Sequence, residues 1–110
     1  MALKPNIPEK ASYELSFQSS RQSTGVTLLT VGWVPKQEHP VPAASDIAVT
    51  PGTTQTLTGQ VPLAADARRM EIRVDLPNGR GWGTLTLKIN GSIHAEDQIG
   101  GDTTWMLMVA

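Results

Sequence analysis

Apolar and polar residues alternate strictly in one segment of the chain, and this rhythm limits the fold more than any other feature. Met70, Ile72, Val74 and Leu76 alternate with the charged residues of 69–75. In a strand, such alternation places all the apolar side chains on one face, whereas a helix would scatter them around its axis. The segment therefore predicts a β-strand with one buried face.

Other segments carry the same signature or a related one. The alternation recurs from Ala11 to Phe17, and segments that are apolar on both faces predict more central strands. The expected strands cover 11–17, 26–34, 47–50, 54–63, 69–76, 82–89, a segment after 92, and 103–110. About eight short strands at roughly ten-residue spacing predict an all-β fold. We expect a small antiparallel β-sandwich with Greek-key or jelly-roll-like connections.

Two proline-containing stretches are predicted to lie outside the strands. We expect residues 1–10 to form a flexible N-terminal arm and residues 11–110 to form a single β-sandwich domain. Proline cannot donate a hydrogen bond to a sheet. We therefore expect the proline-rich residues 35–45 to cross between the sheets or to form an exposed loop.

Asn90-Gly91 is the strongest signal for a short hairpin. A two-residue turn at this point would mix the polar and apolar faces of the two flanking strands. A three-residue loop instead pairs Ile89 with Ile93 and Leu87 with Ala95. Because a one-residue slip moves every side chain to the opposite face, the three-residue loop is the prediction.

Composition restricts the functional classes that need to be considered. The chain of 110 residues has a formal net charge of −1, no cysteine and a hydrophobic fraction of 39%. These values fit one folded core. A nucleic-acid binder would normally carry a basic excess, which this chain lacks, so we expect no binding of nucleic acid. Without cysteine there is no disulfide or thiolate chemistry. No apolar run could span a membrane and residues 1–8 do not resemble a signal peptide, so we expect a soluble domain of undetermined compartment.

One predicted strand face carries a candidate catalytic cluster. Lys88, His94 and Glu96 lie on the polar side of the hairpin, where a small hydrolase could use His94 with Glu96. Cross-strand pairs of complementary charge also occur simply because they stabilise a sheet. We favour this structural interpretation, and therefore predict no catalytic residue and no cofactor.

Metal binding has little support in the sequence. Two histidines without cysteine do not form the usual closed zinc site. Calcium needs only oxygen ligands, which Asp46, Asp97 and Asp102 could supply. The Gly100-Gly101 segment before Asp102 is also typical of an ordinary turn, so no metal site is predicted.

Trp82 is the most informative candidate for ligand binding. It is predicted on the polar side of its strand after a glycine-rich loop, with Asn78, Arg80 and Thr84 nearby. An exposed tryptophan beside hydrogen-bonding groups can stack on the apolar face of a sugar or anchor a protein partner. These four residues form the predicted ligand site.

The C-terminal strand suggests self-association. Trp105 lies on one face and Met106 and Met108 on the other, so both faces are apolar and the outer one needs a cover. These three residues form the predicted oligomer interface, although the N-terminal arm could also provide the cover. The leading hypothesis is a non-catalytic interaction or assembly module that self-associates. The alternatives are a carbohydrate-binding domain that uses Trp82 and the small hydrolase.

Overall fold

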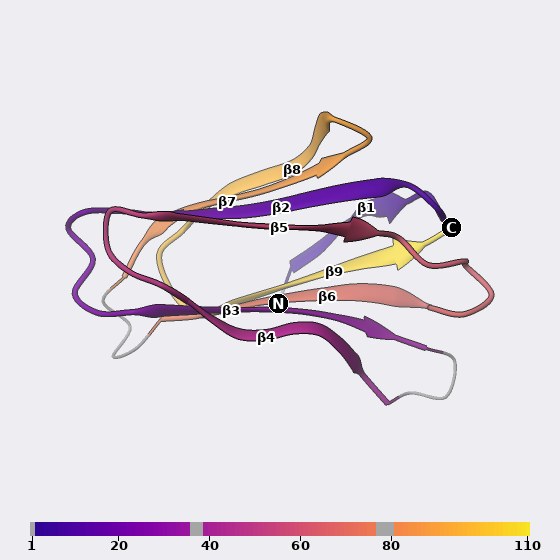
Figure 1. Ribbon diagram of the computed structural model, residues 1–110, viewed down its shortest axis with the longest axis horizontal. Helices are drawn as coiled ribbons and strands as arrows, with labels where there is room; N and C mark the ends of the chain where they lie inside the picture. The colour runs from indigo at the N-terminus through magenta and orange to yellow at the C-terminus, as the bar shows by residue number, and fades with distance from the viewer. Residues whose placement is uncertain (1, 36–38, 77–80) are drawn as a thin grey trace.

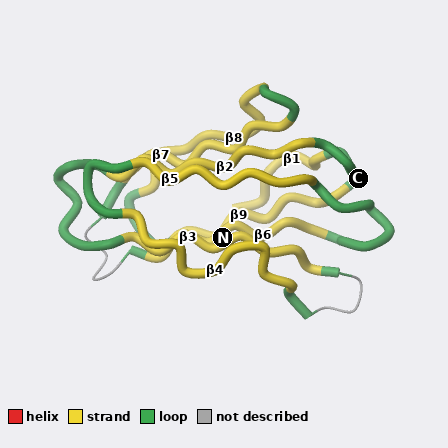
Figure 2. Tube along the Cα trace, in the orientation of Figure 1, coloured by secondary structure: helices red, strands yellow, loops and turns green. Residues whose placement is uncertain are grey.

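The computed structural model describes residues 2–35, 39–76 and 81–110, and it confirms the predicted all-β sandwich. The described residues form nine strands in two facing sheets, with loops at both ends (Figures 1 and 2). The strands are β1 (Ala2–Ile7), β2 (Ser12–Ser19), β3 (Thr27–Val34), β4 (Val41–Val49), β5 (Thr54–Gln60), β6 (Arg69–Asp75), β7 (Gly83–Ile89), β8 (Ser92–Ile99) and β9 (Thr103–Val109). No helix in these described ranges is long and apolar enough to cross a membrane.

The chain changes sheet at most of its connections. The five-stranded sheet has the order β1-β9-β6-β3-β4, and the four-stranded sheet has the order β5-β2-β7-β8. Among the described strands, only β3–β4 and β7–β8 are consecutive in the chain and adjacent in the same sheet. Neighbouring strands are antiparallel except β1 and β9, which run parallel.

The core is built from the alternating residues that predicted the strands. Met70, Ile72 and Val74 of β6 are fully buried, and they face the other sheet together with Trp105 and Leu107 of β9. The opposite sheet contributes fully buried side chains at every second position of β2 and β7: Leu15, Phe17, Leu85 and Leu87. Removal of this apolar area from water is the main force that holds the two sheets together.

The N-terminal segment is a strand, whereas we expected residues 1–10 to be a flexible arm. Residues 2–7 pair in parallel with β9, and Ile7 is fully buried. The Ala110 amide donates to the Ile7 carbonyl at 2.9 Å. Lys4 forms an ion pair with Asp97 of β8, so β1 is also tied to the opposite sheet. Pro5 is compatible with a strand here because β1 is at the sheet edge.

The proline-rich segment is also more regular than predicted. Residues 41–45, which we expected in a loop or crossing, belong to strand β4 and continue into 46–49. Pro42 lies opposite Gly32 of β3, and the register between the two strands shifts twice. Because β4 is an edge strand, the nitrogen of Pro42, which carries no N–H group, can face away from β3, so that the sheet loses no hydrogen bond.

The β7–β8 hairpin satisfies both the preference of Asn90-Gly91 for a two-residue turn and the matching of polar and apolar faces, although the two conflicted in the sequence. Asn90 and Gly91 have φ angles of 51° and 83°, which are the values of a two-residue type I′ turn. The predicted pairing of Ile89 with Ile93 is therefore wrong. A bulge at His94 then restores the predicted pairing of Leu87 with Ala95. The extra residue corrects the faces that the short turn would otherwise mix.

Candidate functional site

A groove of about 750 Å³ opens at one end of the sandwich. It lies where the β2–β3 and β4–β5 connections turn, beside the start of β7 and the end of β8 (left in Figure 1). Ligand sites in proteins commonly have volumes of roughly 300–1,000 Å³. The groove is lined by Gln18, Ser19, Ser20, Arg21, Gly52, Trp82, Gly83, Thr84, Gln98, Ile99 and Gly100.

The backbone of Trp82 is held firmly while its side chain remains accessible. The Ser23 hydroxyl accepts a hydrogen bond from the Trp82 amide and donates one to the Trp82 carbonyl, both at 3.0 Å. The Ser20 amide donates to the same carbonyl at 2.9 Å. The tryptophan nevertheless stays 44% exposed. The Trp82 backbone is therefore held in place before any ligand arrives, which lowers part of the entropic cost of binding.

A tight turn supports Arg21 at the groove. Thr50-Pro51-Gly52-Thr53 closes with a Thr53 amide to Thr50 carbonyl hydrogen bond of 3.1 Å, and Gly52 has a φ of +80°. These are the features of a type II turn, in which glycine accepts the positive φ without strain. A Cβ atom at Gly52 would lie 3.0 Å from Cγ of Arg21. The missing side chain therefore leaves room for the aliphatic part of Arg21.

Gly83 lets β7 approach β2 closely at the base of the groove. A Cβ atom at this position would lie 2.2 Å from the Gln18 carbonyl oxygen and 2.6 Å from Cζ of Phe17. Any side chain would therefore collide with both the backbone and the core. The position admits only glycine without a displacement of β2.

Ser19 lines the groove, but its hydroxyl is buried within the protein. Its side chain is only 2% exposed, and its hydroxyl has no hydrogen-bond partner among the described residues. Most buried hydroxyls in proteins are paired, and one left unpaired costs about 1–3 kcal/mol.

Two of the four residues predicted as the ligand site line this groove. Trp82 and Thr84 do so, whereas Asn78 and Arg80 lie outside the described residues. Sequence reasoning missed the contributions of Gln18, Arg21 and Gln98. Nothing near these positions in the sequence marks them as functional. Only the strand order reveals that they lie beside Trp82.

The residues of the predicted polar cluster are paired individually with other groups. The Thr86 hydroxyl donates to the Glu96 carboxylate at 2.7 Å, and Lys88 lies 3.7 Å from the Glu14 carboxylate. Nε2 of His94 lies 3.1 Å from the carbonyl oxygen of Pro5 in β1. Thr86 and Glu96 lie opposite each other in the register of β7 and β8.

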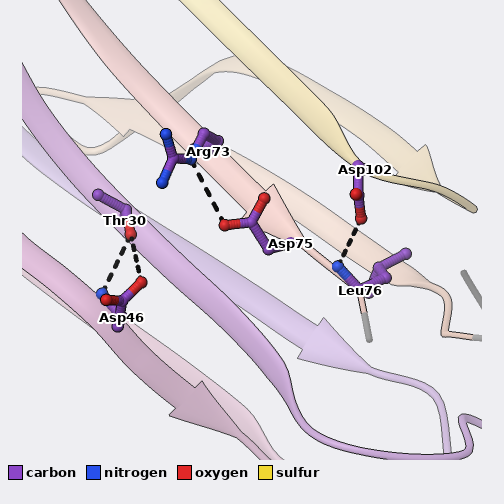
Figure 3. A network of polar contacts seen from close by, with 6 residues as sticks. All are labelled: Thr30, Asp46, Arg73, Asp75, Leu76 and Asp102. Carbon is purple, nitrogen blue, oxygen red and sulfur yellow. Dashed lines mark hydrogen bonds and ion pairs between the residues drawn. The ribbon is translucent and has the colours of Figure 1, made fainter. Parts of the chain in front are cut away.

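The three aspartates considered as calcium ligands have separate structural partners. Asp46 contacts Thr30 across β3 and β4, and Asp102 accepts a 2.7 Å hydrogen bond from the Leu76 amide (Figure 3). Asp97 pairs with Lys4. No group of three or more potential metal-ligating side chains occurs within the described parts of the chain.

Strand β9 differs from the predicted oligomer interface in two respects. Trp105 is fully buried in the core, so it is not accessible to another subunit. Both edges of β9 are also occupied, by β1 and β6. Met108 is 40% exposed and Met106 is half-buried on the outer face. That outer face is the part of the predicted interface that another subunit could reach.

The chain has no match among protein-family models, curated proteins or solved structures.

Proposed function

We propose that the protein is a non-catalytic binding module and that the groove at Trp82 takes a carbohydrate. The observation that carries this proposal is the exposed Trp82 side chain in a groove of about 750 Å³, on a backbone that Ser23 holds by two hydrogen bonds. Tryptophan offers a flat apolar surface against which the C–H face of a sugar ring can stack.

The remaining lining residues suit the polar part of a sugar. Gln18, Thr84 and Gln98 line the groove and carry groups that both donate and accept hydrogen bonds. Sugar hydroxyls need both kinds of partner, so an aromatic surface surrounded by amides and hydroxyls matches the two faces of a saccharide.

The test is a glycan array followed by calorimetric titration of any saccharide that binds. Trp82→Ala should weaken binding at least tenfold, because loss of a central aromatic anchor typically costs about 2 kcal/mol or more. Val41→Ala is the matched control, since Val41 is also exposed but does not line the groove. An array without a single binder would refute the proposal, as would a Trp82→Ala variant with parental affinity.

A second proposal is self-association through the outer face of β9. It is supported by the adjacent, partly exposed Met106 and Met108. In the register of the sheet these methionines lie opposite Glu71 and Arg69, whose side chains form a 3.1 Å ion pair. An apolar strip beside a charged pair suits a modest protein interface. Sedimentation velocity should detect a dimer that Met108→Glu disrupts, and a concentration-independent monomer would contradict this proposal.

A further inference from the structure

We infer that the groove selects acidic saccharides, and that Arg21 recognises the carboxylate of a hexuronic acid. This inference rests on the proposed carbohydrate-binding function and names the class of sugar. Arg21 is exposed at the groove, and its side chain passes over the turn at Gly52. The other described lining residues are neutral, so Arg21 gives the groove a positive charge.

The charge of Arg21 is not neutralised within the described parts of the protein. Arg69 lies 3.1 Å from Glu71, and Arg73 lies 3.4 Å from Asp75. Arg21 has no ion pair with any described residue. An arginine that packs against a turn and has no acidic partner among the described residues is available to an anionic ligand.

A hexuronic acid carries on one ring both of the groups that Trp82 and Arg21 could bind. Its carboxylate is attached directly to the sugar ring, so a single ring offers an apolar face for Trp82 and an anion for Arg21. The guanidinium group is planar and carries parallel N–H donors that fit both oxygens of a carboxylate. A neutral sugar would satisfy Trp82 but would leave the guanidinium without a charged partner.

Attraction by the charge of the whole molecule does not explain such selectivity. The formal net charge is −1, which repels an acidic oligosaccharide slightly at long range. Preference for the acid over its neutral form must therefore arise locally. Because exposed ion pairs are weak and screened by salt, we expect a preference of about fivefold at low ionic strength that diminishes as salt is added.

The experiment compares each acidic oligosaccharide with its own methyl ester. Esterification leaves the ring and hydroxyls in place but removes the carboxylate charge. Oligomers of galacturonate, mannuronate and glucuronate should bind the parent protein about fivefold more tightly than their esters. Arg21→Gln should abolish this difference. Arg73→Gln is the matched control, because it removes the same charge from the outer face of the other sheet and should retain the preference.

The outcomes separate this inference from the proposed function. Equal affinity of the parent for acid and ester would overturn the role of Arg21, and so would an Arg21→Gln variant that still prefers the acid. In either case, loss of binding in Trp82→Ala would leave the carbohydrate site standing. If no neutral or acidic saccharide binds at all, the proposed function itself fails.

Discussion

Replacement of Gly83 by alanine should destabilise the fold severely, although it adds only one methyl group. The new Cβ would lie 2.2 Å from the Gln18 carbonyl oxygen, far inside van der Waals contact, and 2.6 Å from Cζ of Phe17. Neither obstacle can move easily. Phe17 is fully buried in the core, and β2 is bonded to both β5 and β7.

The size of the effect follows from what must be displaced. Overpacking of a tight core usually costs about 1–3 kcal/mol, and here the backbone of a central strand must also shift, so we expect roughly 3 kcal/mol. For a domain of this length, that corresponds to a fall of about 10–15 °C in melting temperature. Urea unfolding followed by tryptophan fluorescence gives the free energy of unfolding directly.

Gly101→Ala provides the control for this prediction. No heavy atom lies within 4 Å of a Cβ built at Gly101, and its φ is not positive. Its free energy of unfolding should be unchanged within about 0.5 kcal/mol, or raised slightly because alanine restricts the unfolded chain. If Gly83→Ala were as stable as Gly101→Ala, the described approach of β7 to β2 would be incorrect.

Three further predictions concern the rest of the sandwich. Burial raises the pKa of Tyr13 above 10.0. The contribution of Tyr13 to the stability of the fold is therefore complete below pH 10 and is lost as the pH rises through the folded-state pKa. Absorbance titration of this single tyrosine should show a midpoint above 10.0, and Tyr13→Phe should reduce the alkaline loss of stability. Asn90→Ala should cost about 1–2 kcal/mol in thermal or urea unfolding, because the Asn90 side chain accepts a 3.0 Å hydrogen bond from the Ser12 amide and its φ is positive. In a double-mutant cycle, Lys4→Ala and Asp97→Ala should show a coupling energy of about 1 kcal/mol, since the ion pair is partly buried and joins the two sheets. If the losses of stability in the two single variants simply added up in the double variant, the ion pair would not stabilise β1.

The central strands were predictable from the sequence because their environment follows an alternating pattern. Residues 69–75 have one face in the core and the other toward solvent, and their side chains were assigned to the correct faces. The edge strands were harder to predict. Pro5 and Pro42 argue against a strand unless one knows that it lies at an edge, and edge position depends on the order of all the other strands.

The hairpin prediction failed for a related reason. Face matching and turn preference gave opposite answers for Asn90-Gly91, and only a bulge at His94 allows both to hold. A bulge leaves little trace in the residue pattern of one strand. The rule that paired residues share a face was valid, but it was applied to a ladder without a bulge.

The candidate site was accessible to sequence reasoning only in part. Trp82 and Thr84 could be identified because they lie on the polar positions of one predicted strand. Gln98 and Arg21 come from other elements and join the groove only through the folded topology. Ser23, which hydrogen-bonds the backbone of Trp82 from 59 residues away, has no distinguishing sequence feature.

The most direct test of the central claim is an NMR titration that follows the indole N–H signals of the three tryptophans. Addition of a saccharide that the array identifies should shift the Trp82 signal and the backbone amides of Gln18 and Thr84. The indole signal of Trp105, buried in the core, should remain in place. Shifts confined to the outer face around Met106 and Met108, with Trp82 unchanged, would contradict the assignment of the groove as the binding site.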